Sequence, residues 1–333
     1  MEQTIAQLLS DYPFVSDYLD QNKLDVAGYE AMTFPQFLEH FSPIELEEMA
    51  IDKESLLADL PIYIQQMKDF LGMDASSLVH SLTILPGHDK NGVPEGFDRL
   101  TVSSSQIISI VGPTGSGKSR LLADIEWAAQ GDTPTGRSIL INEEKPDNKW
   151  RFSSGNKLVA QLSQNMNFVM DLTVQEFLEL HAQSRLCDNA DTVIARIIEE
   201  ANYLAGEKFR LDTPVTSLSG GQSRALMIAD TAILSTSPIV LIDEIENAGI
   251  DRKKALKLLV AEDKIVLMAT HDPLLALIAD RRIVIRNGGI HKVITTSEQE
   301  RELLEELERM DAVIQNTRHK LRDGQLLSTA LLP

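Results

Sequence analysis

The sequence of 333 residues predicts an α/β fold with a small all-α domain in front of it. Two observations support this prediction. Short apolar runs of the buried-strand type alternate with helical segments from about residue 78 onwards. Helical patterns separated by turns fill residues 1–74. Because the pattern changes near residue 75, we place a domain boundary there.

Residues 1–74 are expected to form short helices joined by turns. Pro13 breaks the helical pattern after its first segment. Ser42 stands directly ahead of Pro43, an order that is typical of a helix cap followed by the first helical residue. The expected helices cover Thr4–Leu9, Phe14–Leu19, Phe34–Phe41, Pro43–Met49, and Lys53 onwards to Phe70.

Residues 75–295 are expected to form a mixed sheet with a smaller antiparallel β subdomain and a helical insert. Alternating strand patterns at 78–85 and 99–102, on either side of a Gly-, Asn- and Pro-rich stretch, predict the antiparallel part. Helical periodicity over about 165–235 predicts the insert. The remaining strand-type runs are Gln106–Val111, Ser138–Asn142, Ile239–Ile242, Ile265–Met268 and Arg282–Ile285.

The tail, residues 296–333, contains an amphipathic pattern over Ser297–Leu321. Its apolar side chains recur at helical spacing on an acidic background. They are Leu303, Leu304, Leu307, Met310, Val313 and Ile314. Such a stripe packs either on the body of its own chain or on a second chain in a dimer, and the stripe alone does not name its partner.

A glycine-rich segment stands between the strand-type run 106–111 and a helical segment, Arg120–Ala129. Its residues are Gly112, Pro113, Thr114, Gly115, Ser116, Gly117, Lys118 and Ser119. This is the pattern of a phosphate-binding P-loop, in which glycines let backbone N–H groups converge on phosphate oxygens at a helix N-terminus. Lys118 is then expected to hold the β and γ phosphates, and the Ser119 hydroxyl to bind Mg²⁺. Arg120 either reaches a phosphate or is solvated.

A second motif is the buried-strand run 239–242, which ends in Asp243 and Glu244. A carboxylate at the tip of such a strand is placed to orient Mg²⁺, so we assign this role to Asp243. Its neighbour Glu244 is expected to polarise the water that attacks the γ-phosphate.

A third motif lies earlier in the chain, at Leu218–Gln222. It has the sequence Leu-Ser-Gly-Gly-Gln and stands ahead of a helix-like run. It resembles the signature sequence of ATP-binding cassette (ABC) ATPases. Serine and glycine amides at a helix start suit a γ-phosphate. In that family the signature covers ATP held by the opposite protomer, so the resemblance implies that Ser219, Gly220, Gly221 and Gln222 bind nucleotide across a head-to-tail homodimer.

The same resemblance places the other family elements on this chain. Gln164, nine positions before Thr173, is similar to the Q-loop glutamine that meets Mg²⁺ and the attacking water. His271 resembles the switch histidine that senses the γ-phosphate. Asp251 takes the D-loop position, although the segment between Glu244 and Asp251 is one residue longer than the family pattern. Phe97 is the nearest aromatic residue upstream of the P-loop for stacking on adenine.

The net charge, the single cysteine and the short apolar runs limit which partners and which cellular compartment we expect for this chain. A net charge of −19, from 50 acidic and 31 basic side chains, repels a phosphate backbone, so we expect no general nucleic-acid binding. The single cysteine, Cys187, cannot form an internal disulfide, and the N-terminus lacks the basic region of a signal peptide. The apolar runs fall far short of the roughly 20 residues of a membrane span. We therefore expect a cytoplasmic protein whose membrane connection, if it has one, comes through a partner.

Residues 1–74 are also similar to a small helical domain that stands in front of iron–sulfur repair and related redox proteins. The resemblance lies in Thr4–Leu9, Pro13, Leu24-Asp25 and Gly28, and in Ile51-Asp52 with Leu56 and Leu57, whereas the cysteines of that pattern are missing. It implies a homodimeric ATPase that acts on a protein partner through residues 1–74 or the helical insert, in metallocofactor maturation or reactivation. The alternative is the ATP-binding subunit of a membrane transporter with a separate permease.

Overall fold

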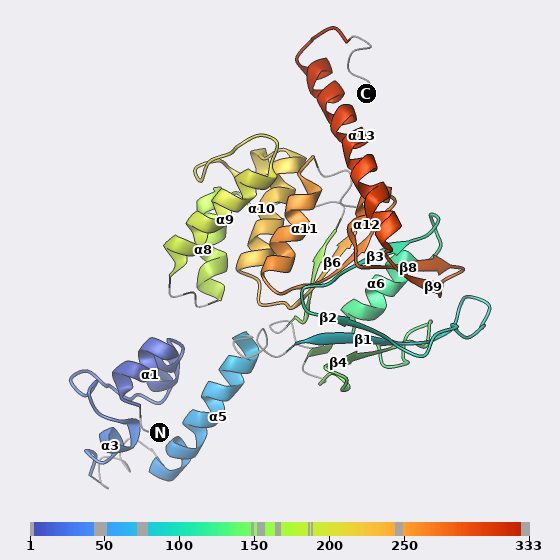
Figure 1. The fold of residues 1–333 in the computed structure, drawn as a ribbon. Helices are drawn as coiled ribbons and strands as arrows, with labels where there is room; N and C mark the ends of the chain where they lie inside the picture. The colour runs from blue at the N-terminus through green and yellow to red at the C-terminus, as the bar shows by residue number, and fades with distance from the viewer. Residues whose placement is uncertain are drawn as a thin grey trace.

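The computed structural model describes residues 3–42, 52–71, 79–147, 150–151, 157–163, 168–185, 187, 189–243 and 249–327. These residues form an N-terminal group of helices, a large mixed sheet, a smaller antiparallel sheet and a set of covering helices (Figure 1). The predicted α/β class is confirmed. No helix of the described part combines the length and the apolarity that a membrane span requires.

The N-terminal helices share a hydrophobic core of their own. They are α1 (Ile5–Asp11), α2 (Val15–Gln21), α3 (Phe34–Leu38) and α5 (Lys53–Leu71). Thr4 and Thr33 each begin a helix with a capping box, which satisfies two backbone N–H groups at the helix start. Buried aromatic and aliphatic side chains, among them Phe34, Phe37 and Leu60, form the core. The expected helix 43–49 lies outside the described residues.

The large sheet has six strands in the order β5-β6-β7-β3-β8-β9. Their bounds are Val159–Leu162 (β5), Ile239–Asp243 (β6), Ile265–Ala269 (β7), Ile107–Val111 (β3), Arg281–Arg286 (β8) and Gly289–Thr295 (β9). All neighbours are parallel except β9, which runs antiparallel to β8. In β6, Ile239 and Leu241 face one core cluster and Val240 and Ile242 face the other. This burial on both sides explains the unbroken apolar run.

The smaller sheet is antiparallel, in the order β2-β1-β4, as predicted for the β subdomain. Its strands are β1 (Ser81–Leu85), β2 (Leu100–Ser103) and β4 (Ser138–Ile141). Helix α6 (Lys118–Glu126) packs Leu121, Leu122 and Ile125 into the cluster that joins the two sheets. The P-loop helix is thereby fixed between two sheets, close to the ends of the strands that carry the candidate site (Figure 1).

Helices cover the other face of the large sheet. They are α8 (Val174–Ser184), α9 (Ala190–Leu204), α10 (Gly220–Ile233), α11 (Arg252–Ala261) and α12 (Pro273–Ile278). Thr173 begins α8 with a capping box, in which the Glu176 side chain accepts from the Thr173 backbone N–H at 2.7 Å. Leu178, Ile197 and Leu226 lie in one core cluster with Val240 and Ile242 of β6, and these buried side chains hold the helices on the sheet.

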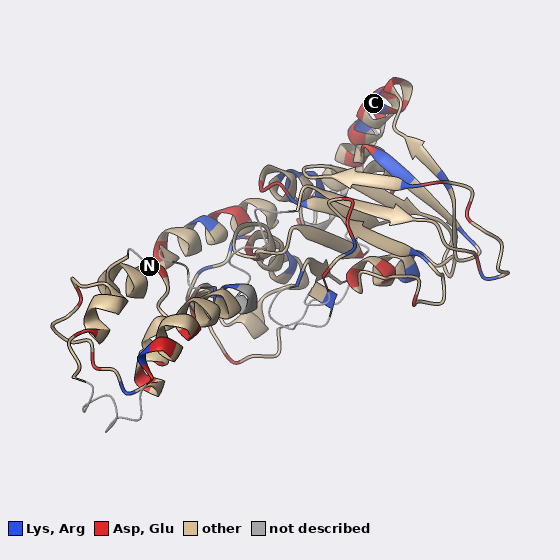
Figure 2. Cartoon of the chain, turned by 90° about the horizontal axis from the view of Figure 1, so that it is seen from below, with Lys and Arg blue, Asp and Glu red and all other residues tan. Residues whose placement is uncertain are grey.

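The last element is α13 (Glu298–Arg322), which matches the predicted helix within one residue at each end. Ser297 and Glu300 hydrogen-bond each other's backbone and side-chain groups at its start. Acidic and basic residues are interspersed along this helix, and it extends outward from the body of the molecule (Figures 1 and 2). It lies against α12.

Candidate nucleotide-binding site

The candidate site lies at the carboxyl ends of neighbouring parallel strands. The P-loop follows β3, Asp243 ends β6, and His271 comes two residues after β7. The register pairs Ala269 of β7 with Ile110 of β3 on one side and with Asp243 of β6 on the other. Three motifs that are far apart in the sequence therefore reach one edge of the sheet, where open α/β sheets bind ligands.

Two P-loop glycines are required by close backbone approach. A Cβ atom on Gly112 would lie 2.6 Å from the carbonyl oxygen of Ile285, and one on Gly117 would lie 2.8 Å from the Cα of Gly288. Gly117 also has a φ of 110°, which L-residues with side chains rarely adopt, and it is the N-cap of α6. The loop can therefore fold tightly over a helix N-terminus only with glycine at these two positions.

Lys118 begins α6, and its side chain turns back into the loop. Its Nζ donates to the carbonyl oxygens of Gly112 at 2.9 Å and Pro113 at 3.4 Å. It also lies 3.1 Å from Nε2 of His271. Because an ammonium group can only donate, the imidazole nitrogen accepts in this contact. The predicted phosphate-binding lysine and the predicted switch histidine thus meet directly, although they lie 153 residues apart in the sequence.

The remaining P-loop side chains divide into exposed and buried ones. Thr114, Ser119 and Arg120 are exposed at the surface of the loop and the first turn of α6. Ser116 is buried, and its Oγ has no hydrogen-bond partner among the described residues. A buried hydroxyl without a partner is costly, so this oxygen is suited to a polar ligand group in the loop.

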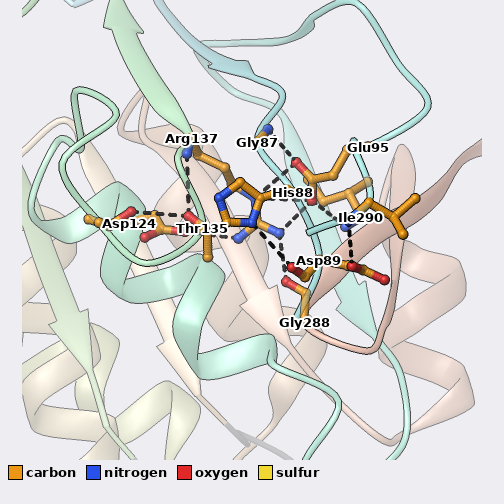
Figure 3. A network of polar contacts seen from close by, with 11 residues as sticks. Gly87, His88, Asp89, Glu95, Asp124, Thr135, Arg137, Gly288 and Ile290 are labelled. Carbon is orange, nitrogen blue, oxygen red and sulfur yellow. Dashed lines mark hydrogen bonds and ion pairs between the residues drawn. The ribbon is translucent and has the colours of Figure 1, made fainter. Parts of the chain in front are cut away.

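Figure 3 shows a buried ionic network, which is joined to the loop by hydrogen bonds through Gly288. Arg137 is fully buried, and its guanidinium pairs with Glu95 at 2.5 Å and with Asp124 at 2.8 Å. Burial by itself lowers the pKa of the Arg137 guanidinium, but the hydrogen bonds and charges of the two carboxylates outweigh burial and raise this pKa. The cation is therefore held firmly in its charged form.

The network reaches the P-loop through Gly288. Arg137 Nη2 donates to the carbonyl oxygen of Gly288 at 2.9 Å, and the backbone N–H of Gly288 donates to the carbonyl oxygen of Ser116 at 2.7 Å. Lys90 Nζ donates to the carbonyl oxygen of Gly115 at 3.3 Å from the other side. These contacts fix the loop conformation, and no sequence motif predicts them. The one available signal was a charged residue, Arg137, next to an apolar run.

The signature segment is exposed at the start of α10. Ser219 is the N-cap of this helix of 14 residues, and its Oγ accepts from the backbone N–H of Gln222 at 3.3 Å. The Gln222 side chain accepts in turn from the Ser219 backbone N–H at 2.9 Å. Gly220 is also exposed, so this helix N-terminus, with its serine and glycine, faces outward. Such a terminus attracts an anion.

Asp251 lies beside the signature segment of its own chain. Its side chain accepts from the backbone N–H of Lys254 and caps α11. Its backbone N–H donates to the Leu204 carbonyl at 3.0 Å, and a Cβ on the nearby Gly249 would lie 3.7 Å from the Cα of Gly221. The D-loop position and the signature are therefore neighbours, whereas Gln164 and Glu244 lie outside the described residues.

Phe97, the nearest upstream aromatic, is partly buried and packs against the core cluster between the two sheets. Its ring serves that core, because an aromatic side chain stabilises the fold mainly by removing its apolar surface from water. We therefore do not assign adenine stacking to Phe97.

Comparison with known proteins agrees with this geometry. A family model described as "ABC transporter" matches residues 98–247. An uncharacterized ABC transporter ATP-binding protein of Methanocaldococcus jannaschii is 50% identical over 250 residues, which cover 75% of this chain and 95% of that protein. The thiamine import ATP-binding protein ThiQ of Haemophilus influenzae is 31% identical over 206 residues, which cover 58% of this chain and 89% of that protein.

Solved structures share the fold. The structure of an ATP-binding subunit of an ABC transporter matches with a TM-score of 0.51 at 20% identity, covering 67% of this chain and 92% of that one. CbiO1 from Clostridium perfringens, part of the ABC transporter complex cbiONQ, matches with a TM-score of 0.50 at 20% identity, covering 71% and 99%. The ordered motifs, the strand-edge site and the extended identity lead to one conclusion: this chain belongs to the ABC family of ATPases.

Proposed function

We propose that this chain is the ATP-hydrolysing subunit of an ABC transporter and works with a separate membrane permease. The observation that carries this proposal is the 50% identity to the Methanocaldococcus relative, which is named an ABC transporter ATP-binding protein and is matched over 95% of its length. The Haemophilus relative, named for thiamine import, supports the same class of function. The transporter subunit with a separate permease, which the sequence offered as the alternative, thereby becomes the leading interpretation.

ATP and Mg²⁺ are the ligands that this family implies, and the P-loop fits them. Gly112 and Gly117 let the loop backbone close tightly against neighbouring main chain, and the buried Ser116 hydroxyl and the Lys118 amine supply polar atoms. We assign the phosphates to Gly112–Ser119, and Mg²⁺ to the Ser119 hydroxyl, Asp243 and Gln164. Mg²⁺ bound there would neutralise part of the negative charge of the phosphates.

In this proposal, three side chains take part in ATP hydrolysis. Glu244 polarises the attacking water, and Gln164 orients it. His271 senses the γ-phosphate, and the 3.1 Å contact between its Nε2 and Lys118 Nζ supports this role because it places the imidazole at the phosphate-binding amine. Arg120, exposed in the first turn of α6, is available to a phosphate or to solvent.

The complete site requires a second copy of the chain. We propose a head-to-tail homodimer in which Ser219–Gln222 of one copy cover the ATP held by the P-loop of the other, with Asp251 at the contact. The exposure of Ser219 and Gly220 at the start of α10 supports this arrangement, because an anion-binding helix terminus that faces outward is open to a ligand on another molecule.

The permease contact is assigned to the helical insert beside Gln164. Val169 is 91% exposed and Met170 44% exposed, and both lie in the stretch between Gln164 and α8. Leu180 of α8 and Tyr203 of α9 are exposed as well. Exposed large apolar side chains on one insert favour a protein contact there. Through this contact the permease would hold the chain at the cytoplasmic side of a membrane.

Residues 1–74 remain a candidate for a second protein contact. The Methanocaldococcus relative is shorter than this chain, since 250 aligned residues make up 95% of it. The expectation that ATP-driven closure serves metallocofactor maturation finds no support in the comparisons. We retain from it only the proposal that residues 1–74 bind a protein partner.

The test uses the Glu244→Gln variant, which should bind ATP but hydrolyse it slowly and so stay in the closed state. Purified with ATP from detergent-solubilised membranes, it should carry a multi-span membrane protein in a fixed ratio. Adding Val169→Asp should reduce this recovery, whereas Val93→Asp, a change at a 57% exposed residue of the β1–β2 connection, should not. Recovery without any membrane protein would contradict the transporter assignment.

A further inference from the structure

Three ion pairs attach helix α13 to the body. Glu300 pairs with Arg282 of β8, Glu308 pairs with Lys253 at 2.6 Å, and Asp311 accepts from Arg252 at 3.1 Å. These three carboxylates are 8 and 3 positions apart, a spacing that keeps them on one side of a helix. They occupy a sector of about 80° of the helix surface, and the rest of that surface carries none of these three attachments.

The neighbouring side, about a quarter-turn around the helix from these carboxylates, carries a regular apolar seam. Its residues are Leu303, Leu307, Met310, Ile314, Thr317 and Leu321, separated by steps of 4 and 3 residues in strict alternation. This is the a/d spacing of a coiled coil. Thr317 fits the seam because its hydroxyl donates to the Val313 carbonyl at 2.7 Å within the helix, which leaves its methyl group for packing.

The seam is largely exposed. Leu303, Met310, Ile314 and Leu321 have exposed fractions of 51%, 59%, 49% and 58%. Single exposed apolar residues are ordinary, but a continuous row of them along a helix marks a contact surface. The helix that carries this row extends outward from the body (Figure 1).

The order of residues in the seam favours a second copy of the same helix in the antiparallel direction. In such a pair, centred on Ala312, Leu303 faces Leu321, Leu307 faces Thr317 and Met310 faces Ile314 of the second copy. Each of these residue pairs then occurs a second time with the two copies exchanged, as a two-fold contact between identical chains requires.

Charges beside the seam favour the same direction, although the two Asp311 carboxylates also approach each other in the antiparallel pair, each with Arg252 of its own chain as a partner. In the antiparallel pair Glu306 lies near Lys320 of the second copy, and symmetry repeats this pair of opposite charges. In a parallel pair Glu306 would instead face Asp311 of the second copy, which places like charges together. In the single chain Glu306 pairs with Arg309 at 2.8 Å, an exposed contact that contributes little and is readily exchanged.

We propose that α13 of two copies of this chain pair in an antiparallel manner through this seam. The contact holds two chains together without nucleotide, which distinguishes it from closure over ATP. It also goes beyond the proposed transport function, because it depends on neither the P-loop nor a permease.

Disulfide trapping tests the direction of pairing. Two chains, both with Cys187→Ser, carry either Leu303→Cys or Leu321→Cys, and one of them has a size tag. The two positions are 18 residues apart, or about 27 Å along the helix. Mixed and oxidised without nucleotide, they should form the mixed disulfide in preference to either disulfide between like chains. Like-chain disulfides alone, or no disulfide, would overturn the proposal.

Charge reversal tests the contact independently. Glu306→Lys or Lys320→Glu alone should weaken nucleotide-free dimerisation about tenfold in sedimentation, since each change alters two pairs. The two changes together should restore it. Arg309→Gln removes only the intrachain partner of Glu306 and should leave dimerisation unchanged. A chain that stays monomeric at all concentrations would overturn the proposal and indicate that another partner covers the seam.

Lys118→Ala separates this inference from the proposed function. The variant should lose nucleotide binding but keep the mixed disulfide, because the seam does not involve the P-loop. If wild-type protein hydrolyses ATP and no mixed disulfide forms, the seam proposal alone fails. If the disulfide forms and wild-type protein does not bind ATP, the proposed function alone fails.

Discussion

Lys118 and His271 meet because their strands, β3 and β7, are neighbours in the sheet. The Lys118 amine has three donors, and its acceptors are the Gly112 and Pro113 carbonyls and the His271 imidazole. A phosphate that binds this amine must take the place of one of them. The contact therefore links the phosphate-binding lysine to the histidine that is proposed to sense the γ-phosphate.

Arg137→Met should destabilise the protein by about 3–5 kcal/mol, because it leaves Glu95 and Asp124 buried without their cation. It should also weaken ATP binding, since Gly288 loses the contact that holds it against Ser116. Urea unfolding and nucleotide titration measure the two effects.

The matched control is Arg196→Met. This arginine is 52% exposed in its ion pair with Glu262, so its loss should cost less than about 1 kcal/mol. Equal losses in the two variants would show that the buried network contributes no more than a surface ion pair.

The P-loop and the signature could be recognised as motifs because each depends on residues that are adjacent in the sequence, and the family resemblance then pointed to His271 by its position after a strand. Arg137 could not be predicted in this way. Its burial depends on Glu95, 42 residues earlier, and on Gly288, 151 residues later. A sequence pattern cannot show that these three residues converge, so the support of the loop could only be found in the structure.

At the level of elements, α13 is fixed at its start by Arg282 and Glu300. The hydrogen bond from the Arg282 guanidinium, followed by that from the Ser297 backbone N–H, lowers the pKa of the Glu300 carboxyl from 4.5 to about 2. Because the folded-state pKa is the lower one, the carboxylate stabilises the folded state fully above about pH 4.5, and this contribution is lost as the pH falls towards 2.

Glu300→Gln should therefore lower Tm at pH 7, and the difference from wild type should shrink between pH 4.5 and 2. Thermal melts of the variant and the wild type at each pH measure this difference in Tm. Acid destabilisation that affects both proteins equally does not contribute to the difference. Glu302→Gln, at an exposed position on the same turn, serves as the control and should show a smaller difference at pH 7. A Glu300→Gln difference that stays constant down to pH 2 would refute the anchoring role.

Most element boundaries followed from apolar periodicity, but β5 and β9 were not predicted. β5 has only four residues and includes the polar Gln161, so its pattern is too short to indicate a strand. β9 carries His291 and Lys292 in its exposed middle. Both strands lie at edges of the sheet, where one side of the strand has no neighbour and the apolar requirement is weaker.

At the scale of the whole molecule, one chain carries one P-loop and one signature segment. The P-loop lies at the end of β3, and the signature faces outward at the start of α10. The proposed homodimer joins each P-loop to the signature of the other copy and thereby makes two identical sites. A symmetric dimer of this kind predicts that defects in the two motifs can complement each other.

Mixing two inactive variants tests this arrangement directly. A Lys118→Ala chain keeps an intact signature, and a Ser219→Arg chain keeps an intact P-loop. Neither variant alone should hydrolyse ATP, because each of its homodimers contains only defective sites. In the mixture, the intact P-loop of one chain meets the intact signature of the other, so ATP hydrolysis should reappear. A mixture that forms mixed dimers yet stays inactive would contradict a site shared between two copies of the chain.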